Sequence, residues 1–556
     1  MPRLLIRGGL LCDGTGDPPR PADVLVEGGR VAEAGARLPA PAGTILEASG
    51  LVVAPGFIDL HSHGDLIHPL PPEAQRPLVA GRLAQGITTE IVGNCGLGVA
   101  PCPEPALPLL RAVVEWMTPG AAAGWPDGAW KDLGSYLARL EGQGTWINVG
   151  SLQAHGPLRV AAAGLERRAG PAARAAMRRA LEEAMDAGAF GLSTGLIYPP
   201  GLFAPTAELA ELAGIVARRG GGGLVASHIR GSSETLLPAV RELIALGRRS
   251  GARVQHSHCE AVGREHWPKI GQVLEMEDAA RAQGVAVAHD MFPYTAAATM
   301  MLAIYPPWAL EGGVGRLLQR LADPAGRAAI RESIESVVPS WPPWTPGGWP
   351  HNLVRAVGWD AITVGSVVSS QGRRYEGMSL VELGRARGAS PFDAVCDLML
   401  EERGKVSQII HGISGEEGSE GGLEAILAHG QAAVCTDAND YGRGRPHPAA
   451  YGAFPRVLGR YVRERRVLSL QEAVHKMTGR PAGLLGLHDR GVVRRGAWAD
   501  LVVFDAETIG SEATCAAPRR PASGIRWVLV NGEVACASGE PPPGARPSGR
   551  ILRRQG

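Results

Sequence analysis

The feature that most constrains the fold is an alternation of short β-rich apolar segments with Ala-, Leu- and Arg-rich helical segments between residue 56 and about residue 440. This alternation is typical of βα units around a parallel sheet. Eight strand candidates can be counted, the number that a closed (β/α)₈ barrel needs. They span residues 57–63, 88–93, 146–156, 190–195, 223–230, 253–258, 285–294 and 432–440. We therefore expect an α/β fold built on a (β/α)₈ TIM-type barrel.

Two further regions flank this barrel, which is predicted to occupy residues 56–490. Residues 1–55 and 491–556 each contain short strand patterns with glycine turns. Neither half has enough strands to bury a core alone, so the two chain ends are predicted to form one small β-sandwich. An insertion near residues 301–375 is rich in proline and tryptophan, which favours a packed lid over a loose linker. Its tryptophans are Trp308, Trp341, Trp344, Trp349 and Trp359.

Composition narrows the class of partner. The chain has 556 residues, 45% of them hydrophobic and 20% charged, and a formal net charge of +1. A balance of this kind predicts no general affinity for nucleic acid or anionic membranes, which leaves a small molecule as the expected partner. No apolar segment reaches the roughly 20 residues of a membrane-spanning helix. The eight cysteines form no CxxC pair, which favours reduced thiols in the cytoplasm. The oligomeric state stays open, with a homo-oligomer among the alternatives.

The first strand candidate carries a metal-binding pattern. Strand residues alternate between faces, so Asp59, His61 and His63 in "DLHSH" project to the same side, which is the interior in a barrel strand of this pattern. Two imidazoles then face one point. On its own, this pair could equally be two hydrogen-bonded core histidines.

Other strand ends carry further potential ligands. His228 ends the fifth strand candidate, His258 the sixth, and Asp437 lies at the end of the eighth. Together with the first pair, this layout resembles that of the amidohydrolase superfamily. His256 is an alternative to His258. Among the remaining histidines, His155 is expected to support a ligand, and His289 and His447 have weaker claims.

The fourth strand candidate lacks the lysine that bridges two metals in many barrels of this superfamily. It reads "FGLSTGLIYPP", and none of the four lysines of the chain lies near it. Cys95, in "VGNCGLGVAP" at the end of the second strand candidate, can supply the missing negative charge, since a thiolate is a good zinc ligand at about 2.3 Å. The alternative, a buried inert thiol, does not explain why Asn94 and Gly96 flank this cysteine.

Motifs along nearly the whole chain resemble the D-aminoacylases, the N-acyl-D-amino-acid deacylases within the amidohydrolases. They include "GFIDLHSHGDL", "VGNCGLGVAP", "GLSTGLIYPPG", "SHIRG", "FPRVLGRYVRE" and "DRGVVRRGAWADLVVFD". The resemblance implies one tight zinc site and a second, weakly held one. The tight site would be made by Cys95, His228 and His258, and the second by His61, His63 and Asp437.

This resemblance implies hydrolysis of a linear amide by a zinc-activated water. Asp437 would accept the proton of the water and return it to the leaving nitrogen, a task for a carboxylate close to the reacting oxygen. Asp440 is the alternative for that role. Two other functions stay open: a cyclic-amide hydrolase such as a hydantoinase or dihydroorotase, and a scaffold without catalysis.

Substrate recognition is where the chain departs from the pattern. The resemblance implies basic residues at positions 260 and 449 that hold a substrate carboxylate, but Glu260 and Ala449 stand there. An acidic side chain favours a neutral or cationic group. The remaining candidate substrate contacts, some of which could replace the lost charge, are Arg230, Tyr294, Arg443 and Arg445.

Overall fold

The computed structural model describes residues 3–39, 43–118, 130–219, 223–342 and 348–554. Its centre is a ring of parallel strands. The ring follows the chain order through β6 (Phe57–Asp59), β7 (Ile87–Val92), β8 (Asn148–Ser151), β9 (Gln153–Ala154), β10 (Gly191–Gly195), β11 (Leu224–His228), β12 (Arg253–His256), β13 (Val287–Met291) and β17 (Ala432–Val434). β8 and β9 are separated by Leu152 alone and occupy one position, so the ring has the eight positions that the sequence predicts. The predicted barrel fold is confirmed.

The ring closes just beyond the last strand. The backbone N–H of Asp437 donates to the carbonyl of His61 at 3.0 Å, which joins the end of β17 to the end of β6. The carboxyl ends of all eight strand positions therefore face one mouth, where barrel enzymes place their chemistry.

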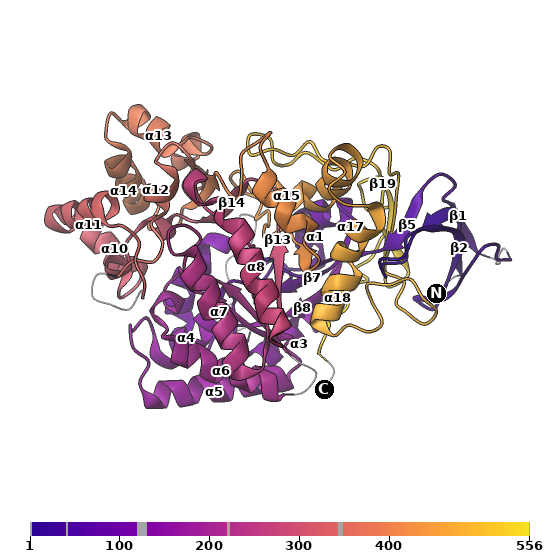
Figure 1. Ribbon diagram of the computed structural model, residues 1–556, viewed down its shortest axis with the longest axis horizontal. Helices are drawn as coiled ribbons and strands as arrows, with labels where there is room; N and C mark the ends of the chain where they lie inside the picture. Colours follow the sequence, from indigo (N-terminus) through magenta and orange to yellow (C-terminus); the bar gives the residue numbers. More distant parts are fainter. Residues whose placement is uncertain (1–2, 40–42, 119–129, 220–222, 343–347, 555–556) are drawn as a thin grey trace.

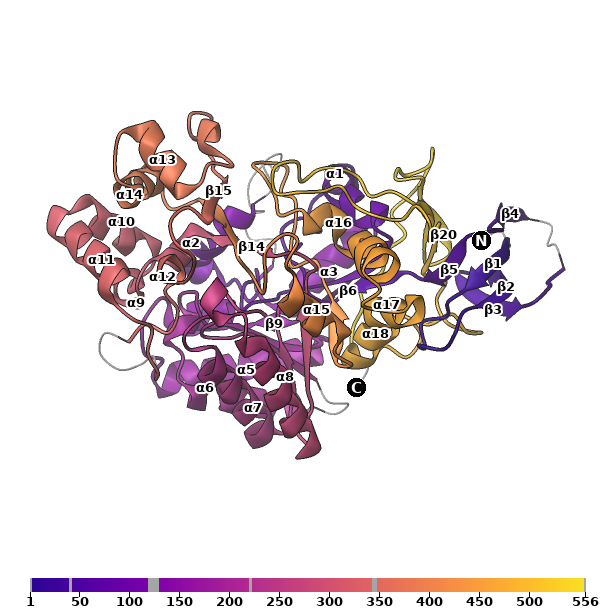
Figure 2. The same ribbon diagram turned by 45° about the horizontal axis from the view of Figure 1, so that its top comes forward.

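Helices cover the outside of the ring, and their sequences explain why. α5 (Pro171–Asp186) starts with a proline at its first turn and buries Met177, Leu181, Ala184 and Met185 along one face. Figure 2 shows α5 beside the other outer helices of that side, α6 (Thr206–Arg218), α7 (Leu236–Ser250) and α8 (Lys269–Ala282). The remaining helices outside the insertion are α1 (Pro72–Ala84), α2 (Leu107–Val114), α3 (Leu133–Gln143), α4 (His155–Ala163), α15 (Gly421–Ala428), α16 (Ala449–Arg456), α17 (Leu470–Met477) and α18 (Gly479–Leu485). In the described ranges, no helix combines the length and the apolar character needed to cross a bilayer.

The two chain ends come together, as predicted, and their strands pair into one eight-stranded sheet. Its strands are β1 (Leu4–Leu11), β2 (Arg20–Glu27), β3 (Arg30–Gly35), β4 (Thr44–Glu47), β5 (Val52–Pro55), β18 (Leu501–Phe504), β19 (Ile525–Val530) and β20 (Glu533–Ala537). β5 joins the halves, because it pairs with β1 on one side and with β18 on the other. Val24, Val53 and Val503 are fully buried in the core of this sheet. The last residues return to the barrel, where the N–H of Leu552 donates to the carbonyl of Val149 at 2.8 Å.

The insertion between β13 and β17 is a packed unit on the opposite side of the barrel from the terminal sheet (Figures 1 and 2). It contains an antiparallel sheet of β14 (Ala296–Met300), β16 (Ser407–His411) and β15 (Ile362–Ser366), with helices α9 (Pro307–Leu310), α10 (Val314–Ala322), α11 (Pro324–Ser336), α12 (Leu353–Val357), α13 (Leu380–Arg387) and α14 (Pro391–Glu401). It extends beyond residues 301–375 because β16 returns to pair with β14. Trp308, Trp341, Trp349 and Trp359 are buried or half-buried, and Trp344 lies outside the described residues.

Candidate metal centre and substrate pocket

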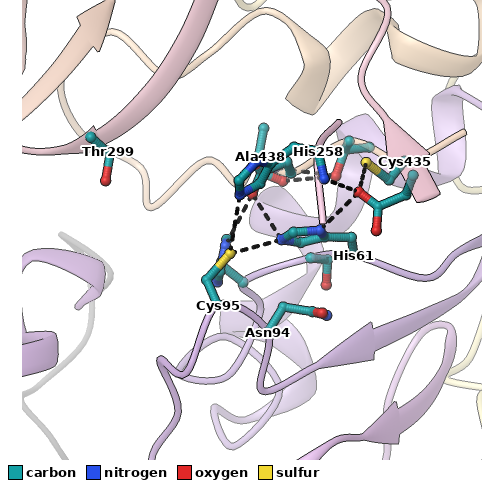
Figure 3. Close-up of polar contacts among 12 residues, drawn as sticks. His61, Asn94, Cys95, His258, Thr299, Cys435 and Ala438 are labelled. Atoms are coloured by element: carbon teal, nitrogen blue, oxygen red, sulfur yellow. Dashed lines mark hydrogen bonds and ion pairs between the residues drawn. The ribbon is translucent and has the colours of Figure 1, made fainter. Parts of the chain in front are cut away.

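Potential metal ligands from five strand ends meet at the mouth of the barrel. They form two groups that share Cys95, and within each group the ligand atoms lie within 4.8 Å of one another. The first group is His61, His63, Cys95 and Asp437, and the second is Cys95, His228 and His258. Figure 3 shows His61, Cys95 and His258 pointing toward one another. The structure thus brings together all six residues that the sequence singles out as ligands.

Three of these ligand residues have a backbone conformation that is uncommon outside glycine. The φ angles are +52° for Cys95, +37° for His258 and +45° for Asp437. Left-handed non-glycine residues cost free energy and cluster at functional sites. Each of the three lies just past the end of a strand, where the backbone turn aims the side chain at the cluster.

The residues that flank Cys95 build its turn. The side-chain amide of Asn94 donates to the carbonyl of Ile91 at 2.9 Å, and the carbonyl of Asn94 accepts from the N–H of Leu97 at 2.8 Å. Gly96 has a φ of +63°, and a Cβ there would lie 2.5 Å from the backbone N of Gly195. The turn therefore packs directly on the end of the fourth barrel strand, where the chain has glycine in place of a ligand.

The surroundings of Cys95 favour a thiolate. Its Sγ lies 3.1 Å from Nε2 of His61 and 3.6 Å from Nε2 of His258. Burial opposes ionisation of this thiol, but the adjacent imidazoles hold its pKa well below the usual value. Burial also raises the pKa of Cys435, whose nearest charged groups are carboxylates, and that thiol stays protonated. A thiolate is the form that ligates a metal.

Asp437 reaches both histidines of the first barrel strand. Its Oδ1 lies 3.2 Å from Nε2 of His61 and 3.1 Å from Nε2 of His63. Burial acts to raise the pKa of this carboxyl, but the two imidazoles outweigh burial and hold the pKa well below the usual range. Asp440, the alternative, is ion-paired with Arg519 and accepts a hydrogen bond from Tyr451 at 3.0 Å. The carboxylate of Asp440 is therefore engaged by partners outside the cluster.

The remaining histidines are accounted for by other partners. His256 and His289 both bond to Glu277 on α8, with Nδ1 of His256 at 3.0 Å and Nδ1 of His289 at 2.7 Å. His155 lies 2.9 Å from Glu208. His447 donates to the carbonyl of Ala296 at 2.8 Å and lines the pocket. The structure therefore places His258, and not His256, in the cluster.

A pocket lined by residues of the barrel and of the insertion opens above the cluster. Among the predicted substrate contacts, Glu260, Arg443 and Arg445 line it. Arg230 does not, because its guanidinium is fully buried against Glu242 at 2.7 Å. Tyr294 also lies outside the lining, with Arg456 stacked 4.8 Å from its ring centroid. These two predicted contacts are corrected.

Several residues that line the pocket or orient a candidate ligand were not predicted from the sequence. The pocket wall includes Tyr198, whose hydroxyl bonds to Thr299 of the insertion at 2.6 Å, and His351, which lies 3.2 Å from the hydroxyl of Ser233. Asp290 on β13 lies 3.1 Å from Nδ1 of His61. Its only sequence signal was a carboxylate in an apolar strand, next to His289.

The donor set fits zinc. A thiolate, imidazoles and a carboxylate are the ligands that zinc prefers. In the described structure these donors are buried and face one another at 3.1 to 3.6 Å. No lysine or arginine nitrogen lies within ion-pair distance of Asp437 in the described residues, so a bound cation is what would balance the thiolate and the carboxylate.

Known proteins share both the sequence and the architecture. The family described as "Amidohydrolase family" matches residues 362–536. N-acyl-D-glutamate deacylase of Alcaligenes xylosoxydans xylosoxydans is 37% identical over 99% of this chain and 96% of its own length. D-aminoacylase of the same organism is 32% identical over 95% of this chain and 93% of its own length. The crystal structure of N-acyl-D-glutamate deacylase from Bordetella bronchiseptica, complexed with zinc and a phosphonate inhibitor, superposes with a TM-score of 0.78 at 34% identity over 99% of both chains. The chain therefore belongs to the N-acyl-D-amino-acid deacylase (D-aminoacylase) family of the amidohydrolases, and is a metal-dependent hydrolase of linear amide bonds.

Proposed function

We propose that the chain removes the acyl group from the nitrogen of a D-amino acid or a close derivative of one, with zinc as its metal. In this proposal Cys95, His228 and His258 hold one zinc tightly. His61, His63 and Asp437 form a second and weaker site that shares Cys95. The observation that carries the proposal is the pair of ligand groups joined at Cys95, directly below a pocket lined by barrel and insertion residues.

Zinc held by these ligands would lower the pKa of a water molecule toward 7 and would polarise an amide carbonyl. The protein supplies the proton transfer. Asp437 lines the pocket with an ionised carboxylate, so it can accept the proton of the attacking water and deliver it to the leaving nitrogen. Its bonds to His61 and His63 hold the carboxylate at that position.

The pocket wall supports a linear substrate. Apolar side chains from the barrel and from the insertion sheet line it, including Leu97, Ile197, Ala298, Ile409 and Ile410. Apolar walls bury an acyl chain and keep bulk water from the reacting amide. The wall contributed by β14 and β16 thus gives the insertion a direct part in binding the substrate.

The test is a substrate panel with zinc-loaded protein. N-acyl-D-amino acids and their carboxamides, the L-enantiomers, and cyclic amides such as hydantoins are compared by kcat/KM. We expect turnover of linear D-compounds, loss of turnover on removal of zinc with a chelator, and recovery when zinc is restored. Turnover of the cyclic amides alone, or of no amide, would contradict the proposal.

A further inference from the structure

Glu260 is an acidic residue of the pocket wall that the proton-transfer scheme does not use. It lies two residues after His258 and is 7% exposed. Its Oε1 is 3.7 Å from Nδ1 of His258. Its other oxygen, Oε2, is buried and has no hydrogen-bond partner within the described part of the chain.

The basic side chain beside this carboxylate is the imidazole of His258, which belongs to the metal cluster. Within the described residues, the ion pairs of Glu260 include no lysine or arginine nitrogen within 4.0 Å. Arg230, which follows the neighbouring strand β11, is paired with Glu242 instead. Arg443 and Arg445 belong to the loop after β17 and line the same pocket. Arg443 donates to the carbonyl of Trp116 at 2.6 Å, and the guanidinium of Arg445 lies beside Gly377 of the insertion. A buried acceptor without a donor in a binding pocket is a site for a donor on the ligand.

The position of Glu260 decides which part of the substrate it meets. In the proposed mechanism Asp437 transfers the proton to the leaving nitrogen. Asp437 and Glu260 both line the pocket beside the candidate metal ligands. A substituent on the carbon next to that nitrogen lies in the same pocket and can meet Oε2 of Glu260. A carboxylate on that carbon has no proton to donate to Oε2, whereas an N–H group can bond to it.

We propose that Glu260 selects the amine part of the substrate. Its free oxygen accepts a hydrogen bond from a carboxamide or a cationic group on the carbon that bears the leaving nitrogen, so N-acyl-D-amino acid amides are better substrates than the free acids. This inference rests on the proposed deacylase function. It adds the chemical class of the group that flanks the scissile bond.

The experiment compares N-acetyl-D-leucinamide with N-acetyl-D-leucine, which differ in charge with little change of shape. With zinc-loaded protein, kcat/KM should favour the carboxamide by at least about tenfold. Glu260→Gln keeps the shape of the side chain and removes its charge, so the ratio should fall to within about threefold of unity through faster turnover of the free acid. Zinc content is measured for each protein, because Glu260 adjoins a metal ligand.

Glu234→Gln is the matched control. Glu234 is a nearby carboxylate outside the pocket lining that pairs with His266 at 3.6 Å, and its variant should keep the wild-type ratio. A smaller carboxamide preference in the wild type, a preference for the free acid, or an unchanged ratio in Glu260→Gln overturns the role of Glu260. If the protein hydrolyses neither compound, that result contradicts the deacylase function and not the role of Glu260. In that case, the affinities of D-leucinamide and D-leucine are measured by calorimetry for the wild type and for Glu260→Gln. A preference for D-leucinamide in the wild type that is lost in the variant would support the role of Glu260, and its absence would overturn that role.

Discussion

One carboxylate oxygen, Oδ1 of Asp290, lies 3.1 Å from Nδ1 of His61 and also accepts the backbone N–H of His258 at 2.6 Å. A single residue of β13 thus positions two of the candidate metal ligands, which come from different strands. Because Oδ1 accepts the proton on Nδ1 of His61, Nε2 is the nitrogen left to face Cys95 and Asp437 and to bind a metal. Carboxylates that orient a ligating histidine in this way tune its basicity and its direction.

Asp290→Asn should weaken zinc binding at the second site, which includes His61, about 10- to 100-fold, because an amide holds the His61 proton less well than a carboxylate does. The measurement is zinc affinity by competition with a chromogenic chelator. Asp440→Asn is the control, since Asp440 is also a buried carboxylate but pairs with Arg519. Equal zinc affinity in Asp290→Asn and the wild type would show that His61 needs no such support.

Cys95→Ala should lose zinc and activity together while the protein stays folded, since the sulfur joins both ligand groups. Metal content is measured beside circular dichroism. Cys536→Ala removes a buried thiol from β20 in the terminal sheet and should keep full zinc and turnover. Full zinc in Cys95→Ala would remove this cysteine from the ligand set.

Asp437→Asn should keep the tight zinc and lose about 10²- to 10⁴-fold in kcat, because an amide cannot accept the proton of the water. The comparison is kcat and zinc content of Asp437→Asn against Asp440→Asn. Near-normal turnover in Asp437→Asn would move the proton transfer to another group.

Glu90→Gln should destabilise the fold by about 3 to 5 kcal/mol, because it leaves Arg82 buried without a counter-charge. Oε2 of Glu90 lies 2.5 Å from Nε of Arg82, and the two side chains are 0% and 4% exposed. The free energy of unfolding is measured in urea. Glu141→Gln breaks the exposed pair with Arg553 at 3.0 Å and should change stability by less than about 1 kcal/mol. Equal losses of unfolding free energy in the two variants would show that the buried pair of Glu90 and Arg82 stabilises the fold no more than the exposed pair does.

The same pair predicts a pH dependence. Burial opposes ionisation of Glu90, but Arg82 and His68 outweigh burial and lower its pKa from 4.5 to about 2. The stabilisation is therefore complete above pH 4.5, the value in the unfolded chain, and is lost as the pH falls toward 2. The difference in unfolding free energy between wild type and Glu90→Gln should thus be smaller at about pH 3 than at about pH 6. If this difference in unfolding free energy instead grows as the pH falls, the lowered pKa of Glu90 is contradicted.

Local sequence patterns were enough to predict the barrel and the place of its chemistry. Alternating apolar segments mark strands whatever they pack against, and the polar residues at their ends were visible without coordinates. The strand candidate at 253–258, for example, carries His256 and His258 at its end. The union of the two chain ends followed from a similar count, since neither end had strands enough for a core.

The tertiary structure decided which of these donors meet. An ideal strand would aim His256 and His258 at the same face, but β12 ends at His256 and the left-handed backbone of His258 turns it toward Cys95. Glu277, on α8, takes His256 away from the cluster, and Glu242, on α7, removes Arg230 from the pocket in the same way. The sequence by itself therefore determined the strands and the kinds of ligand at their ends, because both depend on local periodicity. Which side chains converge depended on partners far along the chain and on turns that break that periodicity, and only the folded structure supplies these.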